Sequence, residues 1–351
     1  MKRLSVSANV GFAAWIAAAR NQIRKKFRIA VQGTRWRLSW APVLLALLGV
    51  LIVNPAKAQG NWVYESGGAV PSDAISGGME PDGTPLYICR AFFQGGVHPG
   101  RVRPGLTGCN IGWGTLEYDV PFYQVLVPLW ASAANGNIPP GAYSYGFEAG
   151  FFGPALYPCR GYLNGGLHPG KVRPGFTGCN IGWGGNEVPV NPYEVLIAGP
   201  YFHLPVDNWP LAAGSLPVQY GPVVGGFEAD GQPLYVCLAG FANGNHPGKF
   251  RPGLGGCNIG WGGAEQTVPT DQSSVMILNW MRPTQVSVLS FQAGNEANGD
   301  GLSICRANVN DGGLYPGKYS WSLNACSIGL NGAEVLSHDF HILTDNTQNP
   351  H

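Results

Sequence analysis

The stretch LYICRAFFQGGVHPGRVRPGLTGCNIGWGTLE, residues 86–117, decides the fold because it occurs four times in the chain. Close copies begin at Leu156 and Leu234, and a degenerate copy, LSICRANVNDGGLYPGKYSWSLNACSIGLNGAE, begins at Leu302. The first cysteines of successive copies lie 70, 78 and 68 residues apart, and the two cysteines within a copy are 20 or 21 residues apart. This self-similarity indicates a tandem-repeat protein.

The repeats divide the chain into six parts. These are a signal peptide (1–58), a lead-in (59–76), repeat 1 (77–146), repeat 2 (147–222), repeat 3 (223–291), and repeat 4 with a C-terminal tail (292–351). The longest spacer, about 200–222, separates repeats 2 and 3. We therefore expect repeats 1 and 2 to form one pair and repeats 3 and 4 the other.

Composition and periodicity predict an all-β protein of antiparallel strands. The 351 residues include 53 Gly and 29 Pro, which disfavours long helices, while 45% hydrophobic residues are too many for a disordered chain. Within repeat 1, residues 86–93, 109–113 and 122–127 have the composition of strands. The pairs Gly95-Gly96 and Pro99-Gly100 are typical of turns.

The N-terminal segment has the pattern of an export signal. Residues 1–58 contain ten of the 21 Lys and Arg and no Asp or Glu, and an apolar run, 43–53, precedes Ala56-Lys57-Ala58. We expect cleavage before Gln59 and a secreted or periplasmic protein without a membrane span; an uncleaved anchor is the alternative. The remaining 293 residues have 11 basic and 20 acidic side chains, a net charge of −9, which argues against nucleic-acid binding.

The eight cysteines of an exported chain are expected to form disulfides. We expect each repeat to close its own disulfide, although eight cysteines allow 105 pairings. Zinc is the alternative, but close C-x-x-C spacing is absent, so we expect neither metal nor cofactor. The cysteines are Cys89 and Cys109, Cys159 and Cys179, Cys237 and Cys257, and Cys305 and Cys326.

Charged residues recur at matching positions of the repeats. Cations follow Pro-Gly at Arg101, Lys171, Lys249 and Lys318, and acids precede the first strand, including Asp82 and Asp230. On Gly-bearing turns, we expect both sets to project into solvent, where an ammonium and a carboxylate together suit a polyhydroxylated ligand such as a sugar. The glutamates that follow the Trp-Gly turn are supporting candidates for such a sugar site; they are Glu117, Glu187, Glu265 and Glu334. The alternative for all these charged residues is that they form structural ion pairs.

The ordered motifs E-P-D-G-x-P-L-Y-x-x-R-A, H-P-G-[KR]-x-R-P and G-C-N-I-G-W-G-G-x-E resemble the DM-nine tandem-repeat family over about residues 77–343. Studied members of that family include invertebrate mannose-binding lectins. The resemblance implies an all-β fold in which two motifs dock on each other, with sugar held by the turn Asp and by the Lys after Pro-Gly.

The repeats match this family pattern unequally. Repeat 3 has both Asp230 and Lys249, whereas repeat 1 has Asp82 with Arg101 in place of lysine. Repeat 2 keeps Lys171 but has Phe151 and Phe152 where the aspartate is expected. Repeat 4 keeps Lys318, with Asn298 at the aspartate position and Asp300 nearby.

Two further residue types recur. His98, His168 and His246 precede Pro-Gly, where we favour loop packing or a ligand-edge role over a metal site. Trp113, Trp183 and Trp261 are predicted to be core residues, with stacking on a sugar ring as the alternative.

The sequence therefore favours an exported, non-enzymatic, lectin-like protein that binds mannose-type glycans or polysaccharide surfaces through several weak sites. The alternative is a structural or protein-interaction repeat protein of the cell envelope. A glycan-cleaving enzyme is disfavoured, because the acids recur in every repeat and no repeat has a distinct pair of its own.

Overall fold

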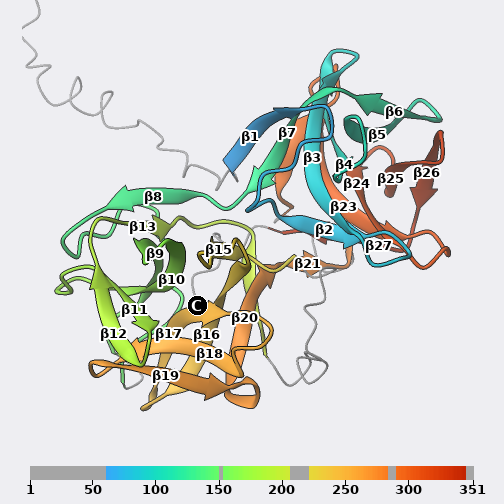
Figure 1. Cartoon of the computed structure of the whole chain (residues 1–351). Helices are drawn as coiled ribbons and strands as arrows, with labels where there is room; N and C mark the ends of the chain where they lie inside the picture. The colour runs from blue at the N-terminus through green and yellow to red at the C-terminus, as the bar shows by residue number, and fades with distance from the viewer. Residues whose placement is uncertain (1–60, 150–152, 206–220, 284–289, 345–351) are drawn as a thin grey trace, which may run out of the picture. The chain divides into compact units, whose positions relative to one another are not determined.

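Figure 1 shows the computed structural model of the chain, which describes residues 61–149, 153–205, 221–283 and 290–344. Within these ranges the regular structure consists of β-strands and one 3-10 turn, Thr270–Gln272, without an α-helix. The all-β prediction is confirmed. No helix in the same ranges is long and apolar enough to cross a membrane. The predicted signal peptide, 1–58, lies outside the described residues.

Each repeat folds into the same series of five strands. In repeat 1, β3 (Pro85–Phe93) and β4 (Gly96–Val102) form a hairpin, β5 (Cys109–Trp113) and β6 (Leu116–Val120) form a second, and β7 (Phe122–Val127) pairs with β3. The three predicted strands are confirmed. The series of repeat 2 is β9 (Tyr157–Leu163), β10 (Gly166–Val172), β11 (Cys179–Trp183), β12 (Asn186–Val190) and β13 (Tyr193–Leu196). That of repeat 3 is β16 (Pro233–Phe241), β17 (Gly244–Phe250), β18 (Gly256–Trp261), β19 (Ala264–Pro269) and β20 (Ser273–Leu278). That of repeat 4 is β23 (Gly301–Asn308), β24 (Leu314–Ser320), β25 (Ala325–Leu330), β26 (Ala333–Ser337) and β27 (Phe340–Leu343).

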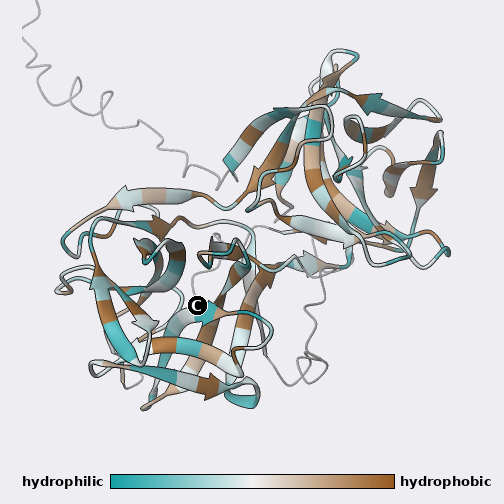
Figure 2. Cartoon of the chain, in the orientation of Figure 1, coloured by the Kyte–Doolittle hydropathy of each residue, from teal (hydrophilic) through white to brown (hydrophobic). Residues whose placement is uncertain are grey.

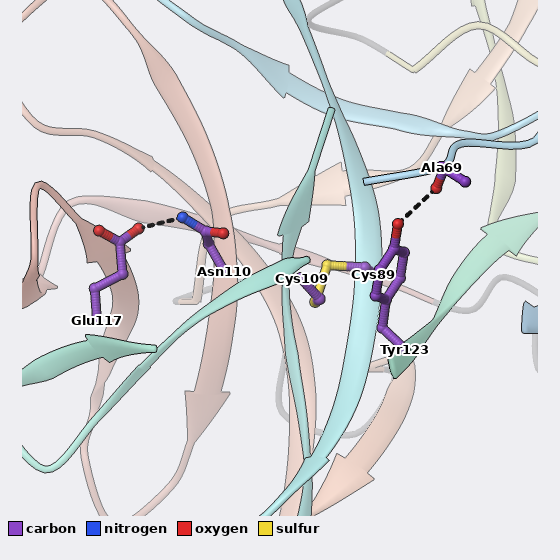
Figure 3. Close-up of a disulfide and its surroundings, with 6 residues drawn as sticks. All are labelled: Ala69, Cys89, Cys109, Asn110, Glu117 and Tyr123. Atoms are coloured by element: carbon purple, nitrogen blue, oxygen red, sulfur yellow. Dashed lines mark hydrogen bonds between the residues drawn. A yellow bond between two sulfur atoms is a disulfide. The ribbon is translucent and has the colours of Figure 1, made fainter. Parts of the chain in front are cut away.

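Each repeat closes its own disulfide, as predicted, and the bonds lie in the cores of the repeats. In repeat 1, Cys89 on β3 is bonded to Cys109 on β5 (Figure 3). Both cysteines belong to a buried cluster that includes Ile111 and Val125. The other three bonds are Cys159–Cys179, Cys237–Cys257 and Cys305–Cys326. Each closes a loop of about 20 residues, which contributes about 3 kcal/mol through the unfolded state. Figure 2 shows polar and apolar residues alternating along single strands, as expected when one face is buried.

The Pro-Gly pair after each histidine position lies within a strand, although the sequence predicts a turn. In the β3–β4 ladder, Pro99 is paired with Arg90 and Gly100 with Cys89. A Cβ atom at Gly100 would collide with the backbone oxygen of Asn110 on β5. Glycine is therefore needed here for the close approach of neighbouring strands, not for a change of chain direction.

Repeat 1 pairs with repeat 4, and repeat 2 pairs with repeat 3, so the predicted pairing of 1 with 2 and 3 with 4 is wrong. The order β3-β2-β24-β25-β26-β6-β5-β4 returns to β3, where β2 is Ser76–Met79. The order β16-β17-β18-β19-β12-β11-β10-β15 returns to β16, where β15 is Val224–Phe227. Each ring is a closed barrel of eight strands. The long spacer is not a boundary, because its beginning, β14 (Tyr201–Pro205), pairs with β20 of repeat 3.

Short strands ahead of the repeats cross to the partner repeat. β2 (Ser76–Met79) pairs with β24, β22 (Gln292–Asn295) pairs with β4, and β15 (Val224–Phe227) pairs with β10. Both repeats of a pair are thus needed to close a barrel. The outer strands β1 (Asn61–Ser66), β8 (Trp130–Ala133) and β21 (Trp280–Met281) pair with β7, β13 and β27.

Partner repeats approach backbone to backbone at the glycine before the tryptophan position. A Cβ atom at Gly182 would lie 2.6 Å from the backbone oxygen of Ile259, and one at Gly112 would lie 2.9 Å from the carbonyl carbon of Ile328. Side chains larger than hydrogen do not fit at these distances. The glycine of the N-I-G-W motif is therefore the point at which two repeats dock.

We expect Gly182→Ala to lower the free energy of unfolding by about 1–3 kcal/mol, because the added methyl group would separate β11 from β18. Gly240→Ala is the matched control, because a Cβ atom there would meet its nearest neighbour, the Gln272 backbone oxygen, at an ordinary 3.5 Å. Urea unfolding of both variants measures the difference. Equal stability of the two variants would contradict the docking role of Gly182.

Candidate functional site

The four cations that follow Pro-Gly lie inside the barrels. Arg101, Lys171, Lys249 and Lys318 are on β4, β10, β17 and β24, and each is no more than 3% exposed. The prediction that these side chains project into solvent from turns is wrong. The Pro-Gly pair continues the strand, and the residue after it faces the barrel interior.

The acid-bearing turns, in contrast, are exposed. Asp82 accepts a hydrogen bond from the backbone N–H of Thr84 at 2.9 Å, and Asp230 accepts one from that of Gln232 at 3.0 Å. The hydrogen bonds from Thr84 lower the pKa of the Asp82 carboxyl group. Among the described residues, no hydrogen bond or ion pair joins Asp82 to Arg101 or Asp230 to Lys249.

A glutamate two residues before the turn aspartate links the turn to the strands. Glu80 accepts a hydrogen bond from Arg103 Nε at 3.0 Å, and the same pair recurs as Glu148 with Arg173 at 3.3 Å and Glu228 with Arg251 at 3.2 Å. Repeat 4 has Ser320 at the arginine position. There Glu296 accepts a hydrogen bond from Lys318 Nζ at 3.1 Å.

In repeat 4 the cation and the turn border one hollow of about 540 Å³. Its lining includes Lys318, Glu296, Asn298 and Asp300 of repeat 4, together with Trp113 of repeat 1. The structure therefore brings the cation that the sequence singled out together with the turn residues that occupy the aspartate position. Both repeats of the barrel contribute to the lining.

The buried histidines face the lysines of partner repeats. The Nδ1 atom of His98 lies 3.2 Å from Lys318 Nζ, and that of His246 lies 3.0 Å from Lys171 Nζ. The Nε2 atom of each ring contacts a backbone oxygen of its own hairpin at 3.0 Å. Because an ammonium only donates, Nδ1 is the acceptor and Nε2 carries the proton. Burial and then the nearby lysine lower the pKa of both imidazoles, which are neutral at pH 7.

Repeat 3 differs in this contact. The Nδ1 atom of His168, a residue that is 2% exposed, has no hydrogen-bond partner in the described part of the chain. Lys249 Nζ lies 3.9 Å from Glu265 Oε1 and makes no hydrogen bond to any residue that the structure describes.

In repeat 1 the arginine is engaged by protein groups. Arg101 Nη2 donates to Glu117 Oε1 at 3.1 Å and to the backbone oxygen of Gly329 at 2.7 Å. Its guanidinium lies 5.1 Å from the ring centre of Tyr315, which occupies the histidine position of repeat 4. The cation of repeat 1 is therefore held in the contact between repeats 1 and 4.

The glutamates after the Trp-Gly turn connect the two repeats of each barrel reciprocally. Glu187 Oε2 accepts a hydrogen bond from the Gly263 N–H, and Glu265 Oε2 accepts one from the Gly185 N–H, both at 2.9 Å. The equivalent bonds in the other barrel, both 2.8 Å, are Glu117 with Gly332 and Glu334 with Thr115. The second oxygen is held within the repeat, as in the Asn110–Glu117 bond drawn in Figure 3.

The recurrent tryptophans lie at the ends of strands and not in the core, so the core prediction is wrong. Trp183 and Trp261 are 36% and 37% exposed. Trp113 packs edge-on against Phe93, with 5.7 Å between ring centres, and also lines the hollow of repeat 4. Each tryptophan is the last residue of its strand.

A family model, that of the DM9 repeat, matches the chain in three overlapping segments, residues 48–120, 81–190 and 151–268. These matches cover more than half of the chain. The protein belongs to the DM9 repeat family. Comparison with curated proteins finds no match. Among solved structures, the chain is similar to the nematode sperm cell motility protein MFP2B, with 14% identity over 82% of this chain and 97% of that chain; the TM-score of 0.18 is too low to support an argument about function.

The DM9 repeats of this chain also contain an arginine–tryptophan stack that sequence reasoning missed. The guanidinium of Arg90 lies 4.2 Å from the ring centre of Trp62 on β1. The same contact joins Arg160 with Trp130 at 4.5 Å and Arg306 with Trp280 at 4.3 Å. The sequence does contain a signal for this contact. In repeats 1, 2 and 4 an arginine follows the first cysteine, and a tryptophan precedes each of these three repeats. The stack fastens the outer strand of the DM9 unit.

We expect the free energy of unfolding of this DM9 protein to fall as the pH drops from 7.5 to 5.5. Burial lowers the pKa of His98, His168 and His246 in the folded protein, so the unfolded chain binds protons first as the pH falls through about 6.5. Urea unfolding at both pH values measures the loss. His246→Gln should show a smaller loss than the unmodified protein, and an equal loss would contradict this assignment.

Proposed function

We propose that the protein is an exported, non-enzymatic carbohydrate-binding protein whose ligands are mannose-type glycans. The observation that carries the proposal is the hollow of repeat 4, where Lys318, Glu296, Asn298 and Asp300 surround a space bordered by Trp113. Membership of the DM9 repeat family supports the same conclusion.

The groups around this hollow match the chemistry of a sugar. Each hydroxyl both donates and accepts a hydrogen bond, and the hollow offers ammonium donors, carboxylate acceptors and an amide that does both. The tryptophan ring offers an apolar face to the C–H groups of a pyranose. Because Lys318 is already paired with Glu296, the hollow suits a neutral polar ligand better than an anion.

Catalysis is not part of the proposal, because the carboxylates next to the cations are engaged. Glu296 is bonded to Lys318, and Glu334 accepts hydrogen bonds from Ser327 Oγ at 2.5 Å and from the Thr115 N–H at 2.8 Å. A glycosidase needs two carboxylates that act as a distinct acid and base, roughly 5–10 Å apart. The arrangement in this hollow fits binding better.

Several weak sites on one chain favour dense glycan surfaces. A shallow site that holds a single sugar binds weakly, but linked sites raise the apparent affinity when the ligand spacing allows simultaneous contact. Repeats 3 and 4 are the strongest candidates, because each has a lysine together with an acid at or beside the turn position. Repeat 1 contributes little, because Arg101 is engaged by Glu117 and Gly329.

A structural or protein-interaction role in the cell envelope is the second candidate. The reciprocal bonds of Glu187 and Glu265 favour it, because they show that recurrent charges serve the scaffold. On this alternative the hollow of repeat 4 has no ligand of its own, and glycan binding is absent.

We expect the protein without residues 1–58 to bind mannan immobilised on a sensor surface. Asp230→Ala combined with Asp300→Ala should weaken binding by roughly tenfold or more, the effect of losing one or two charge-assisted hydrogen bonds. Asp271→Ala is the matched control, because it removes an exposed acid from the 3-10 turn. Failure of the unmodified protein to bind, or unchanged binding by the double variant, would contradict the proposed site.

Export is proposed from the basic and apolar pattern of residues 1–58, and the four disulfides support it because such bonds persist in oxidising compartments. We expect the protein recovered outside the cytoplasm to begin at Gln59, as measured by mass spectrometry of its N-terminal peptide. Replacing Ala56 and Ala58 by bulky residues should block processing. A recovered chain that retains residues 1–58 would contradict cleavage.

A further inference from the structure

At the cations of repeats 2 and 4, a buried lysine and a buried histidine are hydrogen-bonded to each other. At the repeat-3 site, the equivalent residues, Lys249 and His168, are not. Lys318 Nζ donates to His98 Nδ1, and Lys171 Nζ lies 3.0 Å from His246 Nδ1. In repeat 3 the corresponding atoms, Lys249 Nζ and His168 Nδ1, are not bonded to each other, and Nδ1 has no hydrogen-bond partner among the residues that the structure describes. A buried polar atom without a hydrogen bond costs about 1–3 kcal/mol.

The ring of His168 is oriented like those of the other two histidines. Its Nε2 atom faces Gly166, as the Nε2 of His98 faces Gly96, and it is hydrogen-bonded to the Leu163 backbone. Burial, followed by the charge of Lys249, lowers the pKa of His168. The ring is therefore neutral at pH 7, with Nδ1 as an acceptor that faces Glu228 Oε2 at 3.9 Å.

The difference between the repeats lies in the position of the ammonium. In repeat 4, Lys318 Nζ lies within 3.2 Å of both His98 Nδ1 and Glu296. In repeat 3, Arg251 is the donor to Glu228, and Lys249 lies nearer to Glu265. Repeat 3 thus presents a donor, Lys249, and an acceptor, His168, that the protein itself leaves unused.

We propose that His168, a residue of repeat 2, is a ligand-contacting residue of the repeat-3 site, where its Nδ1 accepts a hydrogen bond from a sugar hydroxyl whose oxygen accepts one from Lys249. A hydroxyl fits because it supplies both roles at one oxygen, whereas a carboxylate or phosphate cannot donate to Nδ1. The inference rests on the proposed carbohydrate-binding function and makes the site a composite of two repeats.

Binding at this site depends on pH. The charged groups that face His168 are Lys249 on β17, Glu228 in the turn after β15, and Glu265 on β19, with Arg251 beyond Glu228. A proton on Nδ1 removes the acceptor and places a second positive charge beside Lys249. Affinity is therefore retained at pH 7 and lost in the acidic range, below the ordinary imidazole value of about 6.5, because the pKa of His168 is lowered.

The test uses methyl α-mannoside and the chain without residues 1–58. A background with Trp113→Ala and Asp300→Ala disables the hollow of repeat 4, so that calorimetric titration reports on repeat 3. In this background, His168→Phe keeps the ring volume and removes the acceptor, and should weaken binding about tenfold. His246→Phe is the matched control, because its Nδ1 is already paired with Lys171 in repeat 2, and binding should be retained.

His168→Asn provides a second measurement that a purely structural role would not change. The asparagine oxygen replaces the Nδ1 acceptor but does not titrate. This variant should keep most of the affinity at pH 7 and, unlike the background protein, should still bind at pH 5. The same variant decides the matter if His168→Phe does not fold.

The outcomes separate this inference from the proposed function. Two results would overturn the role of His168 and leave the lectin proposal standing. One is that the unmodified protein binds and the background protein does not. The other is that the background protein and its His168→Phe variant bind equally. Absence of binding by the unmodified protein to mannoside and to mannan overturns both.

Discussion

The structure depends on a contact between partner repeats at which the two backbones approach closely and a glutamate of each repeat accepts a hydrogen bond from the other. At Gly182 the partner backbone is too close for a side chain, and on either side of this contact Glu187 and Glu265 bind the backbone N–H groups of the opposite turn. Because each glutamate satisfies a donor in the other repeat, neither repeat can reproduce the contact alone. The same geometry recurs around Gly112 and Gly329 in the other barrel. The functional unit of the fold is therefore a pair of repeats.

Pairing explains why lysines can lie inside a barrel. An isolated buried ammonium is strongly disfavoured, yet each cation meets a carboxylate of its own repeat and faces the histidine or tyrosine position of the partner. The neutral imidazole is suited to this position because it accepts a hydrogen bond without adding charge. The cations are thus both scaffold residues and candidate binding residues. The carboxylates and histidines near each cation decide how many of its hydrogen bonds the protein itself uses.

Local features could be predicted from the sequence, and pairing could not. The strand 86–93 and the disulfides follow from periodicity and cysteine spacing, which act over short stretches of chain. The spacer at 200–222 was misleading because linker length carries no information about which strand edges match, and β14 joins repeat 3. The motif H-P-G-[KR] identified the right cations but the wrong surroundings, since Gly100 serves close strand packing. The glycine of N-I-G-W was the available signal for docking.

On the binding proposal, the repeats differ in how much hydrogen-bonding capacity the scaffold leaves unused. In repeat 1 the planar fork of Arg101 is consumed by Glu117 and Gly329. In repeat 3, Lys249 and the Nδ1 atom of His168 have no hydrogen-bond partner in the described chain, whereas Lys171 of repeat 2 is bonded to His246. Four copies of one motif therefore differ in which hydrogen bonds their cations make. On the binding proposal, a hydroxyl that enters repeat 3 gains bonds that no other group of the described chain supplies, whereas in repeat 4 it shares groups that are already bonded to each other.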